Sequence, residues 1–423
     1  MTNKYAEKIL QFSLRLNEAQ RPIRILDSVK IPDDVEHFLL QTNCREIPKI
    51  SYDDRPLKYD LGDKRNEFKN LLKDLSRDFS KSDAVYSVFE RNINQYLIVL
   101  EMLNARGRKE FFDFSKELYG HPHELLSDGK NHLYELSFLM DGILENLDQK
   151  NLSQVHNEKL SDIELVDKLK YKLDQYFLGE NIKVKISDGI VSDASAGSDY
   201  IKIKKGGSFS QRDLQIFEVH EGWVHLGTTI NGEKQKFAKW LSKGPPCSTV
   251  TQEGLAVITE LFNFALYPKR ARRLNDRILA CKMAREGADL LQVIEFYRVQ
   301  GANEKDAIAN ACRIFRGADL NGGAPFTKDI SYLKGFIQIY NFIRSSVKEG
   351  KVEQIPFLFA GKVTLEDVPL LYELYQENIV DFPTYLPPQF KDLNGLAVWM
   401  AFSNFLNKMK IDDHSKVLKL FGS

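Results

Sequence analysis

Two histidines five residues apart, His220 and His225, constrain the backbone more than any other feature of this chain. On a regular α-helix, residues i and i+4 lie about 40° apart around the axis, whereas residues i and i+5 lie about 140° apart. Both imidazoles can therefore reach one metal ion only if the helix contains a π-type turn, in which the hydrogen bonds shift to i+5. Gly222 lies between them and makes such a distortion easier. The spacing predicts a locally widened helix.

The residue types around this pair are those of a zinc hydrolase. Glu221 follows the first histidine, and Glu253 comes 28 residues after His225. Three protein ligands leave one coordination position for water, and a further carboxylate can take the proton of that water. Thr249 to Gln252 has capping-box spacing, which predicts a helix with Glu253 in its first turn. A glutamate is also common there without any function, so the residues alone leave both interpretations open.

Residues 303–332 hold the other candidates for binding a substrate. A predicted helix begins at Asn303, and Arg313 and Arg316 are expected to share a face near its end. A glycine-containing loop then leads to Lys328 and Tyr332. Such groups can stabilise an oxyanion or hold a carboxylate. An arginine near a helix C-terminus is equally consistent with simple complementarity to the helix dipole.

Composition argues for a globular enzyme. The chain has 423 residues, of which 43% are hydrophobic, and its 59 basic and 59 acidic residues cancel. Zero net charge gives no indication of a nucleic-acid partner. Four scattered cysteines predict neither a disulfide framework nor a cysteine-rich metal site. The N-terminus lacks the apolar stretch of a signal peptide, and no apolar run approaches the length of a membrane span, so we expect a cytoplasmic protein without a membrane partner.

The hydrophobic periodicity predicts an α+β fold that is mainly helical. Residues 1–160 are expected to be an N-terminal helical region packing on the core, and residues 161–423 the catalytic region. Period-two alternation at 182–186 and 200–204 predicts a small antiparallel sheet beside the metal-binding helix, as in zincin-like metallopeptidases. Helices dominate from Ser210, where Asp213 completes a capping pattern. The last predicted helix, 395–409, is apolar and is expected to pack on the core.

The segment Thr251–Ala256 reads Thr-Gln-Glu-Gly-Leu-Ala and resembles the motif of the flavohemoglobin expression-modulating QEGLA-motif family, which is similar to the microtubule-associated tyrosine carboxypeptidases. The resemblance runs from about Phe38 to at least Gly335. Its other segments are Leu118-Tyr119-Gly120, Asn231-Gly232 with Gln235, Leu241-Ser242 with Gly244, Arg272-Arg273-Leu274, Phe315-Arg316-Gly317, and Phe326-Thr327-Lys328-Asp329 with Tyr332-Leu333 and Gly335.

The resemblance implies a zinc metallopeptidase with one Zn²⁺ ion per chain. His220, His225 and Glu253 would be the metal ligands, and Glu221 the catalytic base. The chain departs from the family pattern at Gly222-Trp223, where a β-branched residue and a glycine are usual, and at Lys236, where proline is usual. Neither departure removes a ligand.

We therefore predict a zinc carboxypeptidase that removes residues from peptide or protein C-termini. Tyr332 is the second predicted catalytic residue, and Arg313, Arg316 and Lys328 are the predicted substrate-binding residues. The alternatives are another zinc amide hydrolase, such as an aminopeptidase, and a non-catalytic zinc-binding regulator. The presence of Glu221 argues against a regulator, since a structural zinc site has four protein ligands and needs no base.

Overall fold

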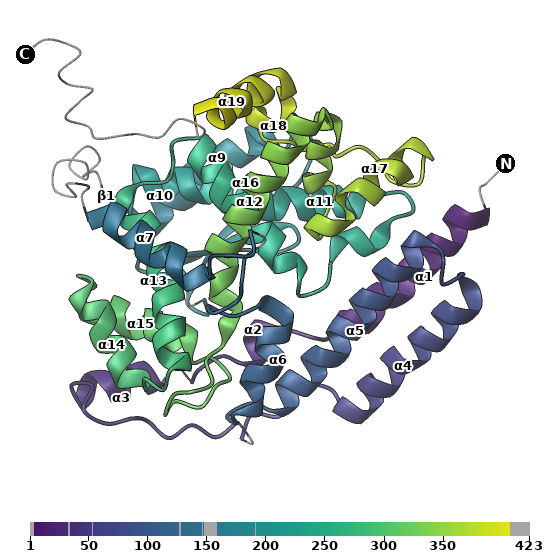
Figure 1. The fold of residues 1–423 in the computed structure, drawn as a ribbon. Helices are drawn as coiled ribbons and strands as arrows, with labels where there is room; N and C mark the ends of the chain where they lie inside the picture. The colour runs from purple at the N-terminus through teal and green to yellow at the C-terminus, as the bar shows by residue number, and fades with distance from the viewer. Residues whose placement is uncertain are drawn as a thin grey trace, which may run out of the picture.

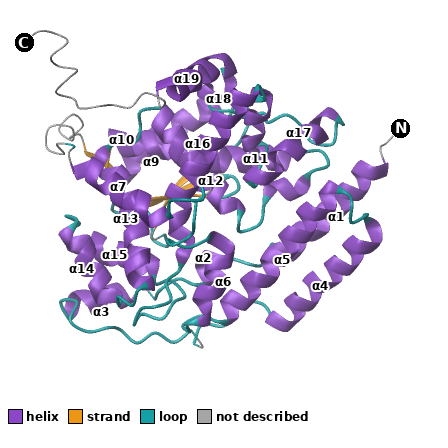
Figure 2. Ribbon diagram, viewed as in Figure 1, coloured by secondary structure: helices purple, strands orange, loops and turns teal. Residues whose placement is uncertain are grey.

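The computed structural model describes residues 4–32, 34–52, 54–126, 128–145, 147, 159–190 and 192–406. Helices make up most of this part of the chain, and the strands are few and short (Figure 2). The expected mainly helical α+β class is confirmed. No helix in the described ranges is long and apolar enough to cross a membrane.

Helices α1, α4 and α5 pack side by side as a layer along one flank of the molecule (Figure 1). Their buried side chains belong to the same hydrophobic cluster as residues of α12 and α16, for example Leu16, Phe89, Leu255 and Ile339. The division of the chain at residue 160 stays a prediction. The helices of the first third are α1 (Lys4–Gln20), α2 (Ile25–Ser28), α3 (Asp34–Gln41), α4 (Leu61–Asp78), α5 (Ala84–Asn104), α6 (Glu110–Tyr119) and α7 (Leu133–Glu145).

The later helices surround the central pair α12 and α16 (Figure 1). The α-helices are α9 (Asp162–Tyr176), α10 (Gln211–Ile216), α11 (Gly227–Lys234), α12 (Ser248–Phe262), α13 (Pro268–Arg285), α14 (Leu290–Val299), α15 (Glu304–Ile314), α16 (Ser331–Glu349), α17 (Val368–Gln376), α18 (Pro388–Lys391) and α19 (Leu393–Leu406). A π-helix, η2 (Phe217–Leu226), joins α10 to α11, and the 3₁₀ helices are η3 (Lys239–Ser242), η4 (Thr327–Ile330), η5 (Val352–Phe359) and η6 (Leu365–Asp367).

Two small sheets precede the π-helix. Strands β1 (Lys159–Ser161) and β5 (Ser208–Ser210) pair antiparallel, and β2 (Lys183–Ser187), β3 (Ala194–Ala196) and β4 (Tyr200–Lys204) form a sheet in the order β2-β4-β3. The predicted antiparallel pairing of 182–186 with 200–204 is wrong, because β2 and β4 run parallel. The strand β3, which lies between them in the sequence, turns back onto β4 as its antiparallel partner and occupies the edge of the sheet.

The last described helix packs on the core as predicted, but only with part of its surface. Helix α19 buries Leu396 and Met400, but Trp399, Phe402 and Phe405 are at least half exposed. The apolar composition of this helix therefore does not reflect complete burial in the core. Residues 407–409 of the predicted helix lie outside the described residues.

Helices α12 and α16 cross where two glycines meet. A Cβ atom added to Gly254 would lie 2.1 Å from the carbonyl carbon of Gly335, and one added to Gly335 would lie 2.0 Å from the Val250 carbonyl oxygen. Both distances are far shorter than a van der Waals contact. The glycine of the Thr251–Ala256 motif thus allows backbone-to-backbone packing next to Glu253.

Helix α13 packs against α7 through polar contacts. Arg272 bonds Asp141 at 2.8 Å, and the Asn275 amide donates to the Ser137 carbonyl at 3.0 Å. The next residue after Asn275, Asp276, is 5% exposed, and its Oδ1 has no hydrogen-bond partner. Burial raises the pKa of Asp276 to about 7, although Arg272 acts to lower it.

We predict that Gly254→Ala lowers the free energy of unfolding by about 3 kcal/mol, because the methyl group must force two backbones apart. Urea unfolding followed by circular dichroism measures this change. Gly142→Ala in α7 is the matched control, since a Cβ at Gly142 meets no atom within 4 Å. Equal stability of the two variants would contradict the proposed close contact.

We predict that Asp276 makes stability depend on pH. The folded state keeps this proton up to about pH 7, whereas an unfolded aspartate loses it near pH 4, so the free energy of unfolding falls as pH rises between these values. The advantage of Asp276→Asn over wild type in urea unfolding should be about 2–3 kcal/mol larger at pH 8 than at pH 5. Asp188→Asn, at an exposed loop position, should show no such difference.

Candidate metal centre

The two histidines lie on a π-helix, as their spacing predicts. The π-helix η2 spans Phe217–Leu226, and Ser210 and Asp213 form the predicted capping box before it. Gly222 has a further role that the sequence does not reveal. A Cβ at this position would lie 2.5 Å from Cδ2 of Leu173, so the glycine lets α9 pack closely on the π-helix.

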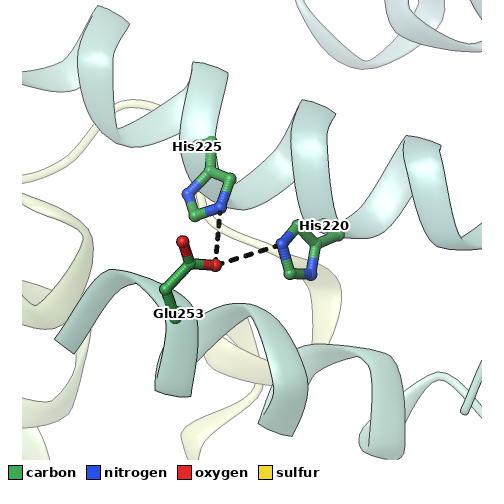
Figure 3. Close-up of side chains that lie close together, drawn as sticks. All are labelled: His220, His225 and Glu253. Carbon is green, nitrogen blue, oxygen red and sulfur yellow. Dashed lines mark ion pairs between the residues drawn. The ribbon is translucent and has the colours of Figure 1, made fainter. Parts of the chain in front are cut away.

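His220, His225 and Glu253 converge on one point (Figure 3). Oε2 of Glu253 lies 3.4 Å from Nε2 of each histidine, and one ligand atom from each residue falls within 4.8 Å of the others. Within the described ranges, this is the one cluster of three such groups. Two imidazole nitrogens and one carboxylate oxygen are a donor set that zinc accepts in catalytic sites. The buried Oε2 of Glu253 has no hydrogen-bond partner, and a metal ion would satisfy it.

A buried carboxylate orients the first histidine. Nδ1 of His220 lies 2.6 Å from Oε1 of Glu260, and Arg270 donates to the same carboxylate from Nε and Nη2. With Nδ1 held by Glu260, Nε2 of His220 is directed at Glu253. Histidines that bind a metal through one ring nitrogen commonly donate the other ring N–H to a carboxylate in this way. Burial acts to raise the pKa of Glu260, but Arg270 and His220 lower it to about 2.

Glu253 is held ionised by a partly buried lysine, Lys328. Helix α12 begins at Ser248, without the predicted capping box at 249–252, and so Glu253 lies in its second turn rather than its first. Burial acts to raise the pKa of Glu253, but Lys328 and the two histidines hold it well below its usual range. Nζ of Lys328 donates to Oε1 of Glu253 at 3.1 Å, which leaves Oε2 for the histidine side.

Glu221 contacts the edge strand of the three-stranded sheet. Its Oε2 accepts a hydrogen bond from the Ala196 N–H at 2.9 Å. The Gly197 N–H donates to the Tyr200 carbonyl, so the pair 196–201 belongs to the non-hydrogen-bonded set of this ladder. The backbone groups of Ala196 therefore point away from β4, and the free edge of β3 faces the metal centre.

A second partly buried lysine, Lys362, ties the π-helix to α12. Nζ of Lys362 donates to the His225 carbonyl at 2.7 Å, to Oγ1 of Thr228 at 3.0 Å and to Oε1 of Gln252 at 3.1 Å. Thr228 and Thr229 also donate to the His225 carbonyl. The π-helix ends at Leu226 and α11 begins at Gly227, so the backbone hydrogen bonds change here from i+5 to i+4 spacing. The His225 carbonyl lies next to this change and accepts hydrogen bonds from side chains. Burial lowers the pKa of Lys362 to about 7, although Glu253 acts to raise it.

Tyr332 lies beside His220, and arginines of α13 and α15 lie around it. The ring of Tyr332 stacks on that of His220 with centroids 6.2 Å apart, and Cζ of Arg277 lies 4.3 Å from the Tyr332 ring centroid. Arg313 forms a two-pronged ion pair with Asp329, at 2.6 and 2.9 Å. Helix α15 ends at Ile314, so Arg316 lies beyond it, and the prediction that Arg313 and Arg316 share a helix face is wrong.

Sequence reasoning missed Glu260, Arg270, Arg277 and Lys362. Glu260 follows Glu253 by seven residues, which places both on one face of α12, and this spacing was a usable signal. A second usable signal was the spacing of three arginines, Arg270, Arg273 and Arg277, which places them on one helix face. Lys362 reaches the site from a loop more than 100 residues after Gln252, and no local pattern marks it.

A family model described as microtubule-associated tyrosine carboxypeptidase matches residues 36–408. The chain belongs to this family. The description of the family names a carboxypeptidase. The search of curated proteins gave no match.

A crystal structure of a protein assigned as a lipoprotein, from Colwellia psychrerythraea, has 13% sequence identity and a TM-score of 0.35 to this chain. The match covers 80% of this chain and 66% of that protein. A TM-score this low does not support a fold assignment.

We predict that Glu260→Gln weakens zinc binding by about 10–100-fold, because the amide no longer fixes His220 as a carboxylate does. Competition with a coloured chelator measures the affinity. Glu286→Gln, an exposed position at the end of α13, should bind zinc as wild type does. Wild-type affinity in a folded Glu260→Gln protein would show that the contact to His220 does not support a metal site.

Proposed function

We propose that the protein is a zinc-dependent carboxypeptidase with a zincin-like core. The observation that carries the proposal is the buried Oε2 of Glu253, which has no hydrogen-bond partner and lies 3.4 Å from Nε2 of both His220 and His225. His220, His225 and Glu253 would hold the ion. When bound, zinc would lower the pKa of a coordinated water and polarise the scissile carbonyl.

Glu221 is the base in this proposal. Its position at the free edge of β3 allows one carboxylate oxygen to keep the Ala196 N–H while the other accepts a proton from the attacking water. The same carboxyl group then gives the proton to the leaving nitrogen. The products are a peptide shortened at its C-terminus and the released residue. The oxygen of the water ends in the new carboxylate, and its proton ends on the leaving nitrogen.

The sheet edge and Tyr332 complete the proposed site. An extended peptide or protein C-terminus can add to the free edge of β3 as a further strand, which would bring its scissile bond beside Glu221. The hydroxyl of Tyr332, whose ring stacks on His220, would donate to the oxyanion of the tetrahedral intermediate. Lys328 acts by holding Glu253 in place, and Arg313 acts by holding Asp329.

The charges around the site favour a carboxypeptidase over an aminopeptidase. An aminopeptidase needs anionic groups for the substrate ammonium, but Arg277, Arg313 and Arg316 gather near Tyr332 with Asp329 as their shared carboxylate. A non-catalytic regulator would have no need for Glu221 beside a three-ligand site.

We predict that Glu221→Gln keeps about one zinc per chain and loses about 1,000-fold in turnover, because the amide cannot accept the proton. Elemental mass spectrometry gives the metal content, and mass spectrometry of a peptide pool with free C-termini gives turnover. Glu218→Gln, on the same π-helix and paired with Lys172, is the matched control and should keep both properties. Undiminished turnover in Glu221→Gln would refute the base, and a wild-type protein without stoichiometric metal would refute the zinc site.

A further inference from the structure

Two buried arginines near Tyr332 lack hydrogen-bonding partners in the described part of the chain. Arg277 is 7% exposed, and its Nε and Nη1 are buried without a hydrogen bond. Arg316 is 9% exposed and forms no hydrogen bond with the described residues, but its guanidinium nitrogens are not among the buried atoms left without a partner. Buried guanidinium groups are normally paired, so the unpaired buried nitrogens of Arg277 indicate a missing anion.

The local charge balance supports the same conclusion. Arg277, Arg313 and Arg316 all interact with one carboxylate, that of Asp329. Arg313 takes both oxygens of this carboxylate, whereas Nε of Arg277 stays 3.9 Å away. Lys328 is already paired with Glu253. Burial and the neighbouring Arg313 lower the pKa of Arg316 to about 10, as expected for a cation that is not neutralised.

Arg277 lies at the right place for the end of a substrate. Cζ of Arg277 lies 4.3 Å from the ring centroid of Tyr332, and that ring stacks on His220, so the arginine and a predicted metal ligand contact the same phenol ring. In a carboxypeptidase substrate, the terminal carboxylate lies one residue, about 3.5 Å of chain, beyond the scissile carbonyl. The group that binds it must therefore be beside the metal ligands without touching them.

We infer that Arg277, assisted by Arg316, binds the terminal carboxylate of the substrate and so restricts the enzyme to free C-termini. This inference rests on the proposed function. The sequence predicted Arg313, Arg316 and Lys328 as the substrate-binding residues. The inferred main carboxylate-binding residue is instead Arg277 of α13, and Arg313 is occupied by its ion pair with Asp329. The Arg277 guanidinium presents parallel N–H groups that match a carboxylate, and its stacking on Tyr332 fixes their plane.

The test measures binding without catalysis. A peptide pool with a randomised last residue and an N-terminal fluorophore is made with a free carboxylate and with a terminal amide. Both pools are titrated with zinc-loaded Glu221→Gln protein, and fluorescence anisotropy gives the dissociation constants. The acid pool should bind at least about tenfold more tightly than the amide pool, because a charge-assisted pair is lost in the amide.

Variants then show which residues cause the preference for the acid pool over the amide pool. Arg277→Gln in the Glu221→Gln background should reduce the acid-to-amide preference to about one, Arg316→Gln should reduce it in part, and Arg277→Lys should keep an intermediate preference. Arg285→Gln, an exposed arginine at the end of the same helix, should leave it unchanged. An unchanged preference in a folded Arg277→Gln protein would overturn the inference.

Three further results separate this inference from the proposed function and from loss of folding. If wild type cleaves nothing but Glu221→Gln protein prefers the acid pool in an Arg277-dependent way, the carboxylate site stands and the catalytic proposal fails. If wild type cleaves acid and amide pools equally well, the catalytic proposal stands and the carboxylate site fails. If Arg277→Gln does not fold, competition of N-acetyl amino acids against their amides on Glu221→Gln protein decides, and equal competition overturns the inference.

Discussion

The crossing of α12 with α16 at Gly254 and Gly335 is the contact on which the site depends. It lets the two backbones touch beside Glu253 and, through α16, brings Tyr332 to the same place. The π-helix that carries the two histidines is fixed to α12 by Lys362. A side chain at the crossing would move the Glu253 carboxylate away from the histidines. The glycine next to the glutamate in the family motif therefore has a geometric reason.

The candidate metal centre combines a π-helix with a buried supporting carboxylate. A π-helix places His220 and His225 on one side, and Glu260 fixes the orientation of His220. Glu253 and Glu260 are directed at the histidines, whereas Arg277 and Lys328 lie against the ring of Tyr332. This separation of charge gives the site a polarity that suits a substrate with a free carboxylate at the end that leaves.

The sequence predicted the parts of the site that depend on local spacing. The i,i+5 separation of His220 and His225 leaves a helix no other way to bring both side chains to one ion, and the π-helix follows from it. Prediction from the sequence failed at the start of α12 and at the direction of β2 relative to β4. The start of α12 was misplaced because capping patterns are common by chance, and the direction of β2 relative to β4 was wrong because pairing depends on β3.

By itself, the sequence determined the fold class and the widened helix, since both rest on periodicity and spacing within one or two elements. The family resemblance added Glu253 to the two histidines as the third clustered side chain. The tertiary structure alone decided which charges are paired. Arg313 and Arg316 look alike in the sequence, yet Arg313 meets Asp329 and Arg316 has no hydrogen-bonding partner among the described residues. Arg277 and Lys362 enter from other elements. Pairing of buried charges is set by three-dimensional proximity, which local spacing does not encode.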